Sequence, residues 1–498
     1  MLLKNENQVL PLKPEKKIAV IGDFARKARY QGAGSSNVNC IRQENVMDLI
    51  DQYPITVIGF AQGYQRDRKK NVHLEEEALS LAKQADQILF FFGLDEISEV
   101  EGMDRPHMRV PENQLALLQK LAKLGKEIIG VLSGGSAIEM PWESCCSAII
   151  HGYLGGEAGA GAMLQALTGQ VNPSGKLNET YPMKYEDTPA YHYCPAKFRD
   201  SQYRESIFVG YRYYNTVGTQ VRYPFGYGLS YTNFDYSDFS LTRDRVTFTL
   251  TNNGDRDGAE VAQVYVGCLS GKIFRPAIEL KGFAKVFLRA GESQTVTIPL
   301  DDKAFRYWNV KTGQWEVEGA DYRVMVGASS EDIRLQGTIA VPGSTDHIPY
   351  SRSMLASYYT GQIRQVPDEE YAALMGGQIP EERRQTEMTV NDALCQMGDA
   401  KSGFARFVYR ILTSIKVRNE RKGKPNLNLL FIYNIPFRGI AKMTNGIVSM
   451  KMAEGMVTAV NGHFWRGIGC VLRGFVANAK ANKEFSRKLF GESGQDKN

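Results

Sequence analysis

Residues 88–94 read ILFFFGL, a run of apolar side chains with polar residues on both sides. An uninterrupted apolar run of this length is typical of a strand that is buried on both faces of a parallel sheet. Four similar runs, rich in Ile, Val or Phe, occur in the first 225 residues: 17–22, 55–60, 128–133 and 148–154. The sequence therefore predicts a mostly parallel sheet of at least five strands.

Stretches with helical periodicity separate these runs, at 75–85, 111–124 and 158–167. Pro111 begins the second stretch, and proline suits the first turn of a helix. Alternating strands and helices build a layered α/β domain, so we assign residues 1–230 to an α/β sandwich.

A different pattern begins near residue 234. Residues 246–253 read VTFTLTNN, in which apolar and polar side chains alternate. Further short strands are predicted at 260–266, 279–288, 295–300 and 322–326, with Gly-, Asp- and Ser-containing turns between them. About seven short strands in such a segment indicate a β-sandwich of the immunoglobulin or fibronectin type III kind, over residues 231–341.

The remaining chain is divided into a linker with short helices, 342–400, and a basic, mainly helical extension, 401–498. The whole chain has 498 residues and a formal net charge of +5. The extension alone holds 18 Lys and Arg against 5 Asp and Glu, a net charge of +13. Any attraction to anionic partners is therefore expected at this extension and not over the whole protein.

Two interpretations of the basic extension remain open. A basic amphipathic segment can lie on an anionic membrane surface. It can equally form a helical lid against another domain, and we favour the lid because Gly and Asn interrupt the apolar stripe of residues 450–479. Nucleic-acid binding is not expected, since no nucleic-acid motif accompanies the charge.

The numbers and spacing of cysteine and histidine give no sign of a metal site. The seven Cys are scattered without Cys-x-x-Cys spacing, and the six His show no metal-ligand spacing, so we expect neither a metal nor an organic cofactor. Sparse cysteines suit reduced thiols in the cytoplasm. The amino-terminal residues do not resemble a signal peptide, and there is no apolar run long enough for a clean transmembrane helix.

The loop after the ILFFFGL run carries four carboxyl groups, Glu96, Glu99, Glu101 and Asp104, with Arg105 adjacent. Ligands bind at the carboxyl ends of strands in α/β sheets. Clustered carboxylates raise one another's pKa, and a protonated carboxylic acid can serve as general acid for a glycosidic oxygen. The spacing alone favours the simpler interpretation, a solvated acidic loop with a local ion pair.

Residues 100–114, VEGMDRPHMRVPENQ, resemble the acid/base loop and helix start of glycoside hydrolase family 3. Further segments resemble the same family and follow in its order; they are 2–12, 31–37, 172–182 and 223–232. Residues 252–265, 279–283 and 326–330 resemble the fibronectin type III-like domain that follows in that family. Several matches in register are more specific than one motif, and the resemblance covers about residues 2–341.

The resemblance implies roles for individual residues. Glu101 occupies the position of the catalytic acid/base, with Glu99 as the second choice. Asp104 and Arg105 are expected to support the loop, and Met103 stands where the family usually has an aromatic residue. The glycine-rich stretch QGAGSSN places Ser35 and Ser36 near the sugar as candidate polar contacts, although a simple tight turn fits equally well.

The family's retaining mechanism needs a second carboxylate, an Asp on a (β/α)₈ barrel, and no part of this chain matches that barrel. We therefore expect a fragment that is inactive without a barrel domain or subunit. The predicted function is hydrolysis of terminal β-D-glucosyl residues from oligosaccharides or glycosides. The alternatives are a β-xylosidase or arabinosidase of the same family, or a non-catalytic carbohydrate-binding or interaction module. A homo-oligomer is compatible with the sequence.

Overall fold

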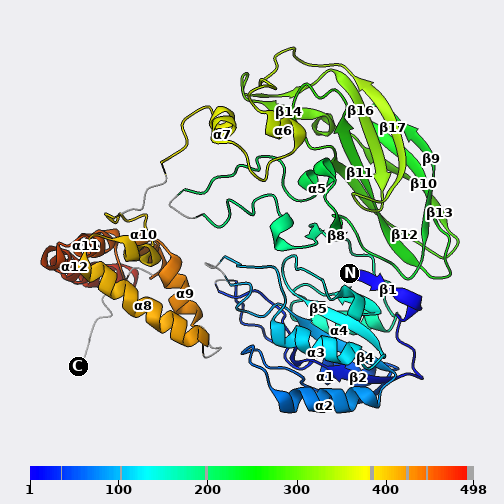
Figure 1. The fold of residues 1–498 in the computed structure, drawn as a ribbon, viewed down its shortest axis with the longest axis horizontal. Coiled ribbons are helices and arrows are strands. Elements are labelled where there is room, and N and C mark those ends of the chain that lie inside the picture. Colours follow the sequence, from blue (N-terminus) through cyan, green and yellow to red (C-terminus); the bar gives the residue numbers. More distant parts are fainter. Residues whose placement is uncertain are drawn as a thin grey trace, which may run out of the picture.

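The computed structural model describes residues 1–34, 36–100, 104–196, 200–381, 386–421, 426–444 and 447–490. Figure 1 shows three parts along the chain: an α/β layer structure, a β-sandwich and a separate group of helices. The fold class predicted from the sequence is confirmed.

The first part is built on a six-stranded sheet in the order β1-β6-β5-β4-β2-β3. Its strands are β1 (Leu2–Asn5), β2 (Lys17–Ile21), β3 (Thr56–Ala61), β4 (Gln87–Gly93), β5 (Glu127–Ser133) and β6 (Ala148–His151). The last five are parallel and correspond to the five predicted apolar runs. β1 was not predicted; it pairs antiparallel with β6 and forms one edge.

Strand β4 shows why the central run is apolar throughout. All seven of its residues are buried. Ile88, Phe90 and Phe92 face one hydrophobic cluster, whereas Leu89 and Phe91 face another on the opposite side of the sheet. Burial on both faces removes the polar alternation that marks a half-exposed strand.

Helices cover both faces of this sheet. α2 (Val72–Lys83) and α3 (Glu112–Ala122) contribute to the cluster on one face, and α1 (Val46–Leu49) and α4 (Gly159–Leu167) contribute to the other. The three helices predicted from the sequence are α2, α3 and α4. β7 (Tyr181–Pro182) pairs antiparallel with β8 (Val221–Tyr223), and α5 (Tyr211–Val217) lies between these two strands in the chain.

The second part is the predicted β-sandwich. One sheet has the order β13-β10-β9 and the other β12-β11-β16-β17. Its strands are β9 (Phe234–Leu241), β10 (Arg245–Asn252), β11 (Gly258–Cys268), β12 (Glu279–Leu288), β13 (Ser293–Pro299), β16 (Ala320–Gly327) and β17 (Ile333–Val341). A separate hairpin is formed by β14 (Arg306–Asn309) and β15 (Gln314–Val317).

The sandwich core follows from strict alternation along its strands. Val246, Phe248 and Leu250 of β10 are fully buried and pack against Val264 and Val324 of the facing sheet. The Thr residues between them are only partly buried, as expected where one face of an antiparallel sheet meets solvent.

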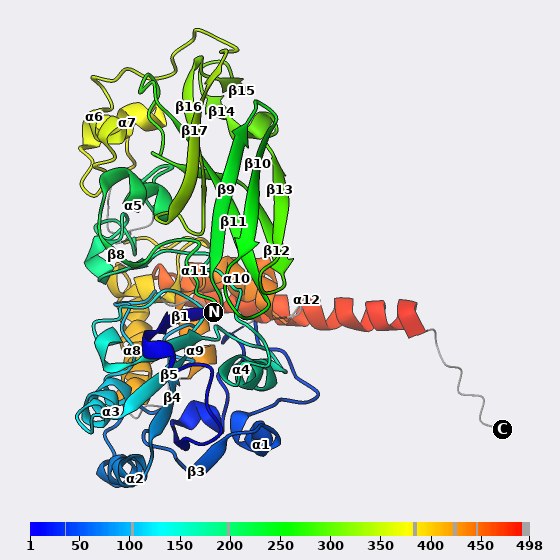
Figure 2. The ribbon, with the colours of Figure 1, turned by 90° about the vertical axis from the view of Figure 1, so that its right-hand side faces the viewer.

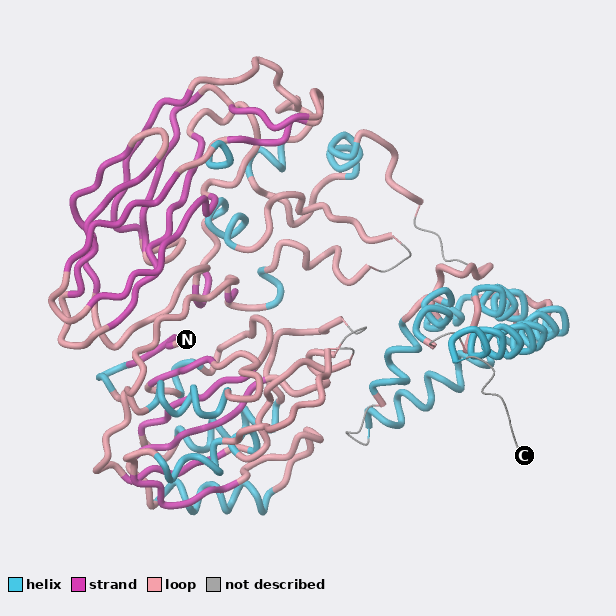
Figure 3. Tube along the Cα trace, turned by 180° about the vertical axis from the view of Figure 1, so that it is seen from behind, coloured by secondary structure: helices cyan, strands magenta, loops and turns pink. Residues whose placement is uncertain are grey.

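The carboxyl-terminal part is helical, as Figure 3 shows from behind. Its helices are α6 (Ala356–Thr360), α7 (Asp368–Met375), α8 (Gly403–Arg421), α9 (Leu427–Asn434), α10 (Phe437–Met443), α11 (Met450–Val460) and α12 (Phe464–Phe490). Helices α6 and α7 lie beside the β-sandwich, where Tyr358 and Tyr371 belong to one hydrophobic cluster with Phe274, and α8 to α12 form the separate group (Figure 1). α6 and α7 lie in the segment expected to hold short helices, and α8 to α12 lie in the extension expected to be mainly helical. Among the described residues, no helix combines the length and apolar character needed to cross a membrane.

Candidate active-site loop

The loops at the carboxyl ends of the parallel strands gather at one edge of the first sheet. Residues 95–100 follow β4, and the loop after β2 runs beside them, with a bridge between Ala33 and Val100. The loop after β5 contributes Gly135 and Ser136. This edge is where α/β sheets bind ligands, and it is where the sequence placed the acidic loop.

Two of the predicted site residues, Glu101 and Ser35, lie outside the described residues, as does Met103. The others are placed. Ser36 and Asp104 are exposed, whereas Arg105 is half-buried. Arg105 donates hydrogen bonds from Nη1 to Ser136 Oγ at 2.7 Å and to the Ala137 carbonyl oxygen at 3.0 Å. Arg105 thus links the segment after Glu101 to the loop after β5.

Glu99 is fixed by the loop after β5. The Gly135 backbone N–H donates to Oε1 at 2.8 Å and to Oε2 at 2.9 Å, and Ser136 Oγ donates to Oε1 at 2.8 Å. Arg29 Nη2 lies 3.7 Å from Glu99 Oε2. Three groups, two donors and one guanidinium, therefore converge on a carboxylate whose side chain is only 11% exposed.

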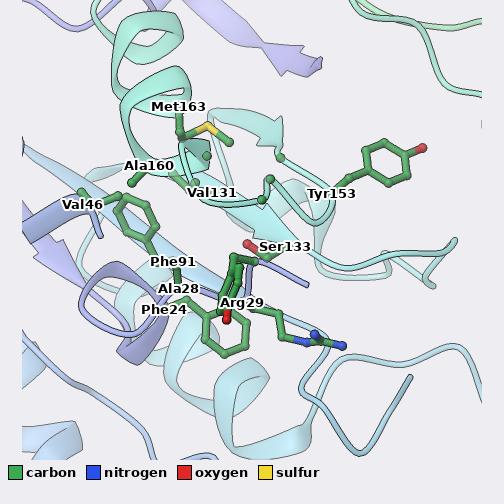
Figure 4. A pocket seen from close by; sticks show the side chains of 15 residues that line it. Phe24, Ala28, Arg29, Val46, Phe91, Val131, Ser133, Tyr153, Ala160 and Met163 are labelled. Carbon is green, nitrogen blue, oxygen red and sulfur yellow. The ribbon is translucent and has the colours of Figure 1, made fainter. Parts of the chain in front are cut away.

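Arg29 is the most deeply buried cation at this edge, with a side chain 2% exposed. Its Nε and Nη2 atoms have no hydrogen-bond partner among the described residues. Burial lowers the pKa of Arg29, and the charges of Glu96, Glu99 and Asp95 oppose that effect. Arg29 is one of the residues that line a small cavity of about 50 Å³, whose wall is otherwise mostly aromatic and aliphatic, with Phe24, Phe91 and Met163 among its side chains (Figure 4).

Two further arginines tie the loop after β3 to the acidic loop. Arg66 bridges Asp23 and Glu96, at 2.6 Å from Nε to Oδ2 and 2.7 Å from Nη1 to Oε1. Arg68 binds both carboxylate oxygens of buried Asp95, at 2.7 and 2.5 Å. Such bidentate pairs are among the strongest hydrogen-bonded contacts in proteins.

The electrostatics of Asp95 follow from these contacts. Burial alone would raise the pKa of Asp95, but hydrogen bonds and charge from Arg68, together with hydrogen bonds from Ser98, outweigh burial and the pKa is lowered. Asp95 therefore holds the beginning of the loop as an ionised anchor.

Glu179 is a carboxyl group near the site that the sequence reasoning did not single out. Burial raises the pKa of Glu179, while a hydrogen bond from the Ala137 backbone and the charge of Arg105 act in the opposite direction. Arg29, Arg66 and Arg68 were missed as well. Only their place after predicted strands could have signalled them, because their partners come from other loops.

The three described carboxylates that precede Glu101 thus each face an arginine: Asp95 faces Arg68, Glu96 faces Arg66, and Glu99 faces Arg29. These three ion pairs fix the course of residues 95–99 and place paired positive and negative charges just before Glu101 in the sequence. Within the described ranges, no three or more His, Cys, Asp or Glu side chains come together as a metal site.

Comparison with known proteins finds two protein-family models that match this chain. Residues 1–231 match the model of the glycosyl hydrolase family 3 C-terminal domain, and residues 260–330 match that of the fibronectin type III-like domain. The chain is 41% identical over 355 residues to thermostable β-glucosidase B of Acetivibrio thermocellus, covering 68% of this chain and 47% of that protein. It is also 41% identical over 359 residues to an exo-α-(1→6)-L-arabinopyranosidase of Bifidobacterium breve, covering 69% of this chain and 47% of that protein.

Comparison with solved structures also finds β-glucosidases. A family 3 β-glucosidase of Bifidobacterium adolescentis aligns with a TM-score of 0.67 and 39% identity, over 75% of this chain and 54% of that chain. A β-glucosidase of Streptomyces venezuelae in complex with D-glucose aligns with a TM-score of 0.64 and 26% identity, over 68% of this chain and 58% of that chain. This chain spans about half the length of the curated relatives it matches.

Proposed function

This chain belongs to glycoside hydrolase family 3, whose C-terminal and fibronectin type III-like domains it carries, and we propose that it supplies the acid/base half of a retaining β-glycosidase. Glu101 is the proposed acid/base. In such a mechanism the acid protonates the leaving oxygen and then deprotonates the incoming water.

The observation that carries this assignment is the set of contacts around Glu99. A general acid must reach the leaving oxygen with its own carboxyl group, whereas the Glu99 carboxylate already accepts three hydrogen bonds from the loop after β5 and lies beside the buried Arg29. Glu99 is therefore better suited to fix the loop than to donate a proton. Glu101, two residues further on and in the family's acid/base position, is left as the candidate.

The nucleophile would be an Asp on a barrel domain, placed about 5–5.5 Å from the acid/base carboxyl, as retaining chemistry requires. The substrate we propose is a β-D-glucoside or a β-glucosyl oligosaccharide, in keeping with the several β-glucosidases among the relatives. No metal or organic cofactor takes part.

A second candidate substrate is an arabinopyranoside, because arabinopyranosidases match as well as β-glucosidase B does, at 41% identity. The two substrates can be separated by assaying an aryl β-D-glucoside and an aryl α-L-arabinopyranoside side by side. The larger kcat/KM identifies the sugar that the complete site prefers.

The test joins this chain to the portion of β-glucosidase B from Acetivibrio thermocellus that it does not match. We expect the chimera to hydrolyse an aryl β-glucoside and the isolated chain to show no turnover. Rapid hydrolysis by the isolated chain would contradict the proposal that the second carboxylate comes from elsewhere. A folded chimera whose activity is unaffected by Glu101→Gln would remove Glu101 from its role.

A further inference from the structure

The helical extension carries an exposed apolar row that the proposed glycosidase function does not use. On α12, Trp465 is 83% exposed, Leu472 60% and Val476 59%. Their spacing of seven and four residues places them in one row along the helix. Apolar side chains exposed in a continuous row usually mark an interaction surface.

A second row, of basic residues, runs beside the first. Arg466, Arg473 and Lys480 follow at seven-residue spacing and are all exposed. In the part of the chain that the structure describes, none of them forms a salt bridge with a carboxylate. The helix thus presents an apolar row flanked by uncompensated positive charge.

Two of the three glycines of α12, Gly467 and Gly474, lie on the side of the helix that packs against α11. Gly467 is buried against α11, where an added Cβ would meet the Gly455 carbonyl oxygen and lie 2.5 Å from the Ala459 backbone nitrogen. Gly474 is similarly close to Met452 of α11. These two glycines therefore permit close helix packing, and Trp465, Leu472 and Val476 lie on the opposite side of the helix. Gly469 lies between Trp465 and Leu472 in the sequence, and an added Cβ there would meet nothing within 4 Å.

Helix α8 extends the apolar surface. Phe407, Ile411 and Ile415 are exposed, with Arg410 and Arg418 also exposed on this helix. Val408 and Leu412 of the same helix pack instead into a hydrophobic cluster with residues of the neighbouring segments. The two helices meet where the Phe404 ring contacts Phe464, at 4.8 Å between ring centroids, and Phe464 contacts Trp465 at 5.1 Å.

Figure 2 shows α12 extending outward beyond the rest of the molecule. A helix of 27 residues is about 40 Å long. A long rod with one apolar row and one basic row fits a flat, negatively charged surface better than a compact pocket. The family models end at residue 330, so this surface lies outside the portion that they describe.

We propose that α12, together with the adjoining face of α8, docks this protein on an anionic lipid bilayer. Trp465, Leu472 and Val476 enter the interface between headgroups and acyl chains, and Arg466, Arg473 and Lys480 contact lipid phosphates. The helix lies on the membrane and does not cross it. This inference is independent of the proposed hydrolysis.

The test uses the full chain and sucrose-loaded vesicles, either of phosphatidylcholine alone or of phosphatidylcholine and phosphatidylglycerol in equal parts. We expect the protein to sediment with the phosphatidylglycerol vesicles only. It should be released at about 1 M salt, where the screening length falls to about 3 Å. Equal binding to both vesicles, or none to either, would overturn the proposal.

Two pairs of variants locate the surface. Leu472→Asp with Val476→Asp should abolish sedimentation, whereas Phe283→Asp, which alters an equally exposed apolar residue of β12, should not. Arg466→Ala with Arg473→Ala should weaken binding about thirty-fold, or about 2 kcal/mol. Arg243→Ala with Arg289→Ala removes the same charge from the β-sandwich and should leave binding unchanged.

Trp465 gives a second measurement that does not depend on sedimentation. Its fluorescence should shift to the blue when phosphatidylglycerol vesicles are added, and Trp465→Phe should remove that shift. If the chain instead forms a dimer that Leu472→Asp dissociates, and binds no vesicles, the surface belongs to a second copy and the proposal is wrong.

Discussion

Both carboxylate oxygens of Glu99 accept hydrogen bonds from the backbone N–H of Gly135, at 2.8 and 2.9 Å. This contact joins the loop after β4 to the loop after β5, across two neighbouring strands. It explains why the segment leading to Glu101 begins from a defined position although its own residues form no strand or helix.

Replacing Glu99 by Ala should destabilise the α/β part by about 3 kcal/mol. The substitution leaves Arg29 buried without its nearest carboxylate and removes the acceptor of the Gly135 N–H. Glu96→Ala is the matched control, because the Glu96 side chain is 38% exposed and Arg66 keeps Asp23 as a partner. Its expected cost is at most about 1 kcal/mol. Urea unfolding followed by tryptophan fluorescence measures both; equal losses would mean that Glu99 is not an anchor.

Glu101→Gln in the chimeric enzyme should lower kcat/KM for a disaccharide by about 10²–10⁴. The loss should be much smaller for a dinitrophenyl glucoside in the first step, because that leaving group departs without a proton. Added azide should then restore turnover and yield a glycosyl azide, since azide attacks without general-base help. Glu99→Gln should show neither pattern. Equal losses on both substrates without azide rescue would assign the acid/base role to another residue.

His151 should make the fold more sensitive to acid. Burial lowers the pKa of His151 to about 3, and the ring lies 2.9 Å from the Tyr181 hydroxyl and 3.2 Å from the Leu132 carbonyl oxygen. Below its ordinary pKa of 6.5, the unfolded chain binds a proton that the folded protein does not. Stability should therefore fall by up to about 1.4 kcal/mol per pH unit below that value, until the folded-state pKa is reached.

The measurement is urea unfolding at several pH values between about 7 and 5. His151→Gln should reduce the slope of unfolding free energy against pH, whereas His73→Gln, at an exposed position of α2, should leave the slope unchanged. Identical slopes for wild type and His151→Gln would show that the imidazole is not buried in its neutral form.

Gly467→Ala should separate α11 from α12, because the new methyl group would meet the Gly455 carbonyl and the Ala459 backbone nitrogen. Gly469 is the control on the same helix, since an added Cβ there meets nothing within 4 Å. Gly469→Ala should stabilise the helix by up to about 1 kcal/mol. Hydrogen exchange of the α11 and α12 amides should rise for the first variant and fall for the second. The opposite order would contradict the close packing.

The strands and helices of the first two parts could be predicted because the order of apolar and polar residues along the chain reflects which faces of each element are buried. The ILFFFGL run identified β4, and the alternation of 246–253 identified β10, since each pattern reflects one or two buried faces. β1 was not predicted because its four residues are too few to show a periodic pattern of apolar side chains. Its pairing with β6 also depends on residues far away in the sequence. The acidic loop was located correctly at the sheet edge, but its three arginine partners were not foreseen.

The sequence by itself determined the fold class, the family resemblance and the position of the loop that bears Glu101. These depend on local patterns of apolar and polar residues. Only the tertiary structure decided that Glu99 is a fixed carboxylate, because Gly135, Ser136 and Arg29 reach it from two other loops. The same holds for α12, where Gly467 and Gly474 lie on the packed side and the exposed row lies opposite. Which side of a helix is covered depends on its neighbours, and spacing along one chain does not specify them.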